Sequence, residues 1–68
     1  MSIDEADKYI DKHVRLVDID DQIFEGDVSD LIPGVESSSG KDSLDIFVDH
    51  VYLVIPLDEI KDICILEN

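Results

Sequence analysis

The feature that most constrains the fold is a change in the spacing of apolar residues at position 13. Before it, Ile3, Ala6 and Ile10 recur at helical intervals. After it, short runs rich in Ile, Val and Leu follow one another, separated by polar turns or by Pro and Gly. The chain of 68 residues is therefore expected to form one domain, residues 1–68, with a short helix followed by strands.

The helix is predicted at about residues 3–11. Ser2 and Glu5 have the spacing of a capping box, and Asp4 adds negative charge at the positive end of the helix dipole. Lys8 and Lys12 fall toward the other end. Because so short a helix is not stable alone in water, we expect it to pack on the strands that follow.

Five strands are predicted, at about residues 13–19, 22–30, 44–49, 51–56 and 61–66. The polar turn Asp20-Asp21-Gln22 makes the first two a hairpin, and Asp49-His50 is expected to join the third to the fourth. Residues 57–60 suit a helical turn before the last strand. Gly26 indicates a bulge, a sharp bend or a close backbone approach inside the second strand. Strands this short enclose one core only by curling, which predicts a strongly bent antiparallel barrel.

Residues 33–43 are the one clear loop, and their Ser and Gly content predicts a flexible surface excursion. The loop is long for a domain of this size. Such a loop is either functional or an idle insertion, and the idle insertion is our default expectation.

The charge limits the partners. Eighteen Asp and Glu against five Lys and Arg give a formal net charge of -13. Such a chain repels nucleic-acid backbones and anionic membrane surfaces. Solubility is the simplest role of this charge; a basic protein partner and mimicry of a nucleic-acid backbone are the alternatives.

Composition also bears on the compartment. A hydrophobic content of 44% argues against a disordered acidic tail. The single cysteine, Cys64, excludes an internal disulfide framework and fits a reducing environment. No apolar run approaches the roughly 20 residues of a membrane helix, and no signal peptide opens the chain. We therefore expect a cytoplasmic protein without membrane contact.

Candidate catalytic and metal-binding groups lack the spacing that their chemistry needs. The acidic segment 18–21 has neither the Gly nor the Glu of a calcium loop. His13, His50 and Cys64 fall on three separate elements, and Cys64 is expected to be a small buried side chain. No nucleophile elbow or phosphate-binding loop occurs, and no carboxylate pair is singled out. We expect no metal, no cofactor, no small-molecule substrate and no enzymatic activity.

Two segments have motif-like residue spacing: the first combines apolar residues with an Asp, a Phe and a Gly, and the second matches at apolar positions alone. The first supplies Val14, Leu16, Asp20, Phe24, Gly26 and Val28, and the second supplies Ile55, Ile60 and Ile63. In this the chain resembles the two signature motifs of the Sm-like (LSm) family, over most of residues 3–66. The resemblance implies a helix followed by a five-stranded Sm-like or SH3-like barrel. Asp18, where an apolar residue is usual, and Asp21, in place of a turn glycine, depart from the pattern.

The residues with which Sm proteins hold a uridine base are missing from the matching positions. Ile32 stands in place of the Asp, Glu36 lies near the place of the Asn, and Pro56-Leu57 replaces the Arg-Gly pair. Pro has no N–H donor and Leu has no charge, so the usual pocket cannot form. RNA would have to be bound through another face. Candidate contacts for it are Asp30, Lys41 and Lys61.

The resemblance also implies assembly, because Sm-like proteins form rings by pairing the fourth strand with the fifth strand of a neighbour. Residues 51–55 are apolar on both faces, so we expect them to be central in the sheet or covered by a neighbouring subunit. Candidate self-association residues are Val51, Leu53, Ile63 and Ile65. Self-repulsion argues against large rings at low salt, which leaves a monomer and a small homo-oligomer open.

We therefore expect a non-catalytic Sm-like binding or assembly module that uses its surface for protein contacts or self-association. One alternative is an RNA-binding protein that acts through a non-standard face. A second is an acidic decoy of a basic nucleic-acid-binding protein. The aromatic residues have no basic neighbours, so they predict core and subunit contacts rather than a platform for stacking bases. They are Tyr9, Phe24, Phe47 and Tyr52.

Overall fold

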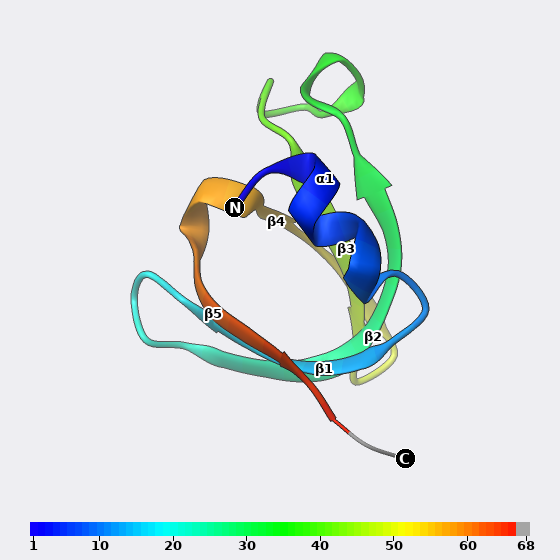
Figure 1. Cartoon of the computed structure of the whole chain (residues 1–68), viewed down its shortest axis with the longest axis vertical. Helices are drawn as coiled ribbons and strands as arrows, with labels where there is room; N and C mark the ends of the chain where they lie inside the picture. Colours follow the sequence, from blue (N-terminus) through cyan, green and yellow to red (C-terminus); the bar gives the residue numbers. More distant parts are fainter. Residues whose placement is uncertain (67–68) are drawn as a thin grey trace.

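The computed structural model describes residues 1–66, which form one five-stranded antiparallel sheet with a short helix at the N-terminus (Figure 1). The strands are β1 (His13–Asp18), β2 (Ile23–Ile32), β3 (Ser43–Val48), β4 (Val51–Pro56) and β5 (Ile60–Ile65). Their order in the sheet is β4-β3-β2-β1-β5. The predicted mostly β class, helix and five strands are confirmed. The sheet is not closed, since β4 and β5 are its two edges.

The helix is shorter than predicted. It consists of α1 (Ile3–Ala6) followed by a 3-10 turn, η1 (Asp7–Tyr9). The predicted capping box is present, with the Glu5 N–H donating to Ser2 Oγ and the Ser2 N–H to Glu5 Oε1. Asp11 then adopts a left-handed φ of 64° and donates its N–H to the Val28 carbonyl, which directs the chain toward β1 instead of continuing the helix.

The hairpin between β1 and β2 depends on the two residues that depart from the Sm-like pattern. Asp18 is buried, and its Oδ1 accepts hydrogen bonds of 2.9 Å from the N–H groups of Asp20 and Gln22. Asp21 adopts a φ of 62°, a conformation that Asp tolerates better than most residues. A carboxylate at Asp18 therefore holds the turn where the pattern has an apolar side chain.

The sheet bends sharply along β2, which extends two residues beyond its predicted end. A Cβ on Gly26 would lie 2.1 Å from the carbonyl oxygen of Phe47, so the backbones of β2 and β3 approach closely at this glycine. The register between these strands shifts between Val28 and Asp30, where Ser29 is the extra residue. The close approach predicted at Gly26 is thus present, and the bulge lies three residues further along. Figure 1 shows the sheet curving around the interior.

The turns predicted at Asp49-His50 and at residues 57–60 are present. Asp49 and His50 form the turn between β3 and β4 with φ values of 49° and 68°. A 3-10 turn, η3 (Leu57–Glu59), precedes β5. The loop 33–43 contains a further 3-10 turn, η2 (Gly34–Glu36), and Gly34 donates its N–H to Asp42 Oδ1 over 2.8 Å.

The core lies inside the curved sheet, where apolar side chains alternate along the strands. Its buried members are Ala6, Val14, Leu16, Val28, Leu44, Ile46, Ile55 and Leu57. Tyr9 and Phe24 pack against this core, as predicted, whereas Cys64 is half-buried rather than buried. No helix within residues 1–66 has the length and apolar character needed to cross a membrane.

Candidate interaction surface

The edge strand β4 combines an open backbone edge with exposed apolar side chains. None of its residues, Val51–Pro56, is charged. Val51, Tyr52 and Val54 are 54%, 64% and 53% exposed. Proteins usually protect an edge strand with charges, a bulge or a covering element. The run that was expected to be central or covered by a neighbouring subunit is an edge of the sheet and so is not central, and nothing within residues 1–66 pairs with its outer side.

The opposite edge is β5, where Ile65 is 44% exposed. Of the predicted self-association residues, Val51 and Leu53 lie on β4, and Ile63 and Ile65 lie on β5. Leu53 and Ile63 also pack against the core, so they have a structural role in the single chain. The structure places the two pairs on opposite edges of one sheet, which is the arrangement that pairing between copies requires.

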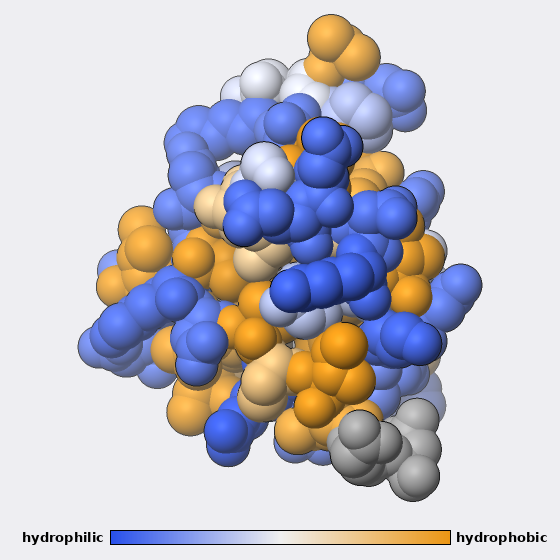
Figure 2. Space-filling model, viewed as in Figure 1, coloured by the Kyte–Doolittle hydropathy of each residue, from blue (hydrophilic) through white to orange (hydrophobic). Residues whose placement is uncertain are grey.

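A surface hollow of about 280 Å³ lies beside β5, between this strand and the N-terminal helix. Its lining includes Tyr9, Ile60 and Ile63 together with Lys8 and Lys61. Figure 2 shows hydrophilic and hydrophobic residues interspersed on one face of the molecule.

A row of side chains crosses four strands on the outer face of the sheet. His13 is opposite Asp27, Asp27 is opposite Phe47, and Phe47 is opposite Tyr52. Directly opposed residues of antiparallel strands project from the same face, so these four side chains form one line. We call it the outer row. It could not be seen in the sequence, because it depends on the register of three strand pairs.

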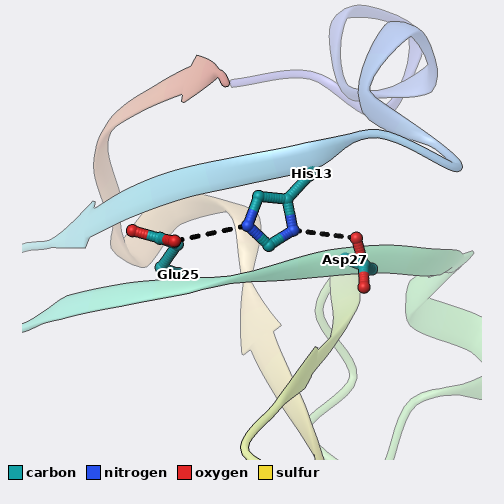
Figure 3. A network of polar contacts seen from close by, with 3 residues as sticks. All are labelled: His13, Glu25 and Asp27. Carbon is teal, nitrogen blue, oxygen red and sulfur yellow. Dashed lines mark hydrogen bonds and ion pairs between the residues drawn. The ribbon is translucent and has the colours of Figure 1, made fainter. Parts of the chain in front are cut away.

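At one end of the outer row, His13 lies between two carboxylates of β2 (Figure 3). Its Nδ1 is 2.9 Å from Asp27 Oδ1 and its Nε2 is 3.3 Å from Glu25 Oε2. The hydrogen bond with Asp27, and then that with Glu25, raises the pKa of His13 above its ordinary value of 6.5. His13 is the first residue of β1, where the predicted strand also begins, and its contacts hold β1 to β2 on the outer face.

At the other end, Phe47 and Tyr52 are in contact, with ring centroids 4.7 Å apart and planes inclined by 47°. The ring of His50 meets Phe47 edge-on at 6.2 Å. In the next register position, Asp45 is opposite Val54. Asp45 also accepts a 2.8 Å hydrogen bond at Oδ2 from the hydroxyl of Ser29. The outer face of the β3–β4 hairpin thus carries aromatic rings beside carboxylates.

The three candidate RNA contacts lie apart in the fold. Asp30 is on β2, where its Oδ1 accepts from the N–H of Leu31. Lys41 precedes β3 and pairs with Asp58 over 3.3 Å, and Lys61 on β5 pairs with Asp21. No hydrogen bond or ion pair within the described part of the chain joins any two of the three residues.

Within residues 1–66, no cluster of three or more His, Cys, Asp or Glu side chains has the arrangement of a metal site. No protein-family model, no curated protein and no solved structure matches this chain. A proposal for its function therefore depends on the two edges, the outer row and the charge.

Proposed function

We propose that this chain is a divergent Sm-like module, a strongly bent barrel that acts without catalysis by associating with further copies of itself. The observation that carries the proposal is the uncharged, apolar edge of β4, opposite the second open edge at β5. Within one copy, β4 and β5 do not pair with each other. Between copies, β4 of one copy can pair with β5 of the next and so continue the sheet. Such head-to-tail contacts give a closed ring when the rotation between subunits allows it.

The order of the elements supports the Sm-like part of this proposal. A helix comes first, five antiparallel strands follow, and η3 stands between β4 and β5, as the resemblance implies. The close approach at Gly26 and the bulge at Ser29 supply the curvature that a small barrel needs. A reducing cytoplasm is the compartment in which the lone Cys64 would remain a thiol.

The ion pairs of Lys41 and Lys61 weigh against the RNA-binding alternative. Each ammonium group already faces a carboxylate, and the chain carries a net charge of -13. Phosphate binding depends on clustered cations that displace counterions, and within residues 1–66 these two lysines are on separate elements, each paired with a carboxylate. Protein contacts are therefore the class of interaction that we propose.

Light scattering after size-exclusion chromatography tests the proposal, at low salt and again at about 1 M salt, where the screening length falls to about 3 Å. We expect the mass to rise to a multiple of the single chain as repulsion is screened. Val51→Asp and Ile65→Asp should each prevent this rise, because they place charge at an open edge.

Val35→Asp is the matched control, because it adds the same charge at a loop side chain that is 95% exposed. It should associate as the unmodified chain does. Circular dichroism should show that all three variants fold. A chain that remains monomeric at every salt concentration would contradict the proposal, and so would edge variants that associate normally.

A further inference from the structure

The outer face of the β3–β4 hairpin offers a binding surface distinct from the sheet edges. Phe47 and Tyr52 stack loosely against each other, His50 meets Phe47 edge-on, and Tyr52 leaves most of its surface in solvent. Val54 extends the apolar surface along β4. An exposed cluster of aromatic rings at the rim of a strongly charged molecule is a feature of interaction sites.

Carboxylates flank this aromatic cluster in fixed register. Asp27 lies opposite Phe47, and Asp45 lies opposite Val54, so both project from the same face as the rings. Strands β3 and β4 contain neither Lys nor Arg. The surface therefore combines π faces with negative charge and has no cation of its own on these two strands.

We infer that this face binds a cationic polypeptide, with an arginine side chain placed on the rings of Tyr52 and Phe47 and paired with Asp45. A guanidinium group suits both halves of the surface, since it stacks on aromatic rings and forms paired hydrogen bonds with carboxylates. The net charge of -13 attracts such a partner at long range.

The same charges argue against two other occupants. A nucleic-acid strand could stack its bases on the rings, but its phosphates would face Asp27 and Asp45. A second copy that packed its outer face on this one would place its own Asp27 and Asp45 against these carboxylates. Edge pairing uses the backbone of β4, whereas this contact uses side chains on the outer face, so the inference does not depend on self-association.

Fluorescence anisotropy with a labelled peptide of repeated Arg-Gly-Gly tests the inference, at about 50 mM salt so that attraction is not screened. We expect binding by the unmodified chain and by Tyr52→Phe, and a loss of about fivefold or more in affinity for Tyr52→Ser. Asp45→Asn should also weaken binding. Ile19→Ser is the control for Tyr52→Ser, because it removes an exposed apolar side chain elsewhere without changing the charge.

Several results would overturn the inference. One is the absence of peptide binding; another is equal affinity of Tyr52→Ser and the unmodified chain, which would indicate attraction by net charge alone. Tighter binding of a labelled thymidine oligonucleotide than of the peptide would favour nucleic acid instead. A peptide with Lys in place of Arg should bind more weakly, and equal binding would contradict stacking of a guanidinium group. Light scattering on the same samples reports edge pairing separately, so failure of either proposal leaves the other measurable.

Discussion

The carbonyl oxygen of Phe47 lies 2.1 Å from the place that a Cβ on Gly26 would occupy. Residues 21 positions apart in the sequence are thus brought together so closely that only glycine fits without movement of a strand. This contact sets how closely β2 and β3 approach each other at Gly26.

Gly26→Ala should therefore destabilise the fold by about 2 kcal/mol or more, since overpacking at a rigid backbone contact has costs of this order. Urea denaturation followed by circular dichroism measures the change. Gly40→Ala is the comparison: it meets no atom within 4 Å and has only its φ of 76° to accommodate, a cost of about 1 kcal/mol. Equal losses of unfolding free energy in the Gly26→Ala and Gly40→Ala variants would contradict a steric role for Gly26.

Asp18 should be required for the β1–β2 turn. Asp18→Ala removes the acceptor of two N–H groups and should cost about 1–2 kcal/mol. Asp18→Asn keeps an oxygen acceptor and should cost less. Asp18→Leu introduces the apolar residue that is usual in the Sm-like pattern, yet we expect it to be as destabilising as Ala. Greater stability of the Leu variant in urea unfolding would show that packing outweighs the turn.

His13 should make stability depend on pH. The hydrogen bonds with Asp27 and Glu25 raise its pKa in the folded chain. The contribution of His13 to the free energy of unfolding is therefore fully present below the pKa of His in the unfolded chain, about 6.5. It is lost as the pH rises through the higher pKa of His13 in the folded chain. NMR titration of the His13 ring protons should give a midpoint above 6.5.

Asp27→Asn should lower this midpoint, because it removes the larger of the two causes. His50→Gln is the control variant and should leave the His13 titration unchanged. A midpoint at or below the ordinary value in the unmodified chain would contradict the charge pairing drawn in Figure 3.

Salt should stabilise the chain, because a net charge of -13 opposes the compact state. Asp30 and Asp45 lie opposite each other across β2 and β3. Asp30→Asn should therefore raise stability at low salt by a few tenths of a kcal/mol, an effect that fades as salt increases. Glu36→Gln removes the same charge in the loop and should have a smaller effect. Urea unfolding midpoints across a salt series measure both, and a midpoint that falls with salt would contradict this account.

The order of the elements could be predicted from the sequence because each has its own local signal. Apolar spacing changes at position 13, Ser2 and Glu5 cap the helix, and Asp49-His50 interrupts two β runs. The predicted bounds of the elements differed from the observed ones mainly where residues distant in the sequence make contact. At Asp11, for example, the N–H donates to the Val28 carbonyl, and the helix ends earlier than predicted.

The candidate surface was less accessible to sequence analysis. Val51 and Ile65 could be chosen from their apolar runs, but their positions on opposite edges follow from the strand order. The outer row needs three registers at once, and so the neighbours of His13 and Tyr52 were not predicted. The apolar pattern around Asp18 indicated a departure from the Sm-like motif and gave no sign that the Asp18 carboxylate holds a turn.

The hydrogen bond from Gly34 to Asp42 has a practical consequence for experiments on this small molecule. It joins the two ends of the loop, and Asp42 also accepts the Leu57 N–H at its carbonyl, so the base of the loop is held to η3 by a contact that does not involve the loop tip. Val35 stands clear of every strand, almost fully in solvent. A fluorophore or an affinity tag inserted there would report on assembly while leaving both edges and the outer face accessible.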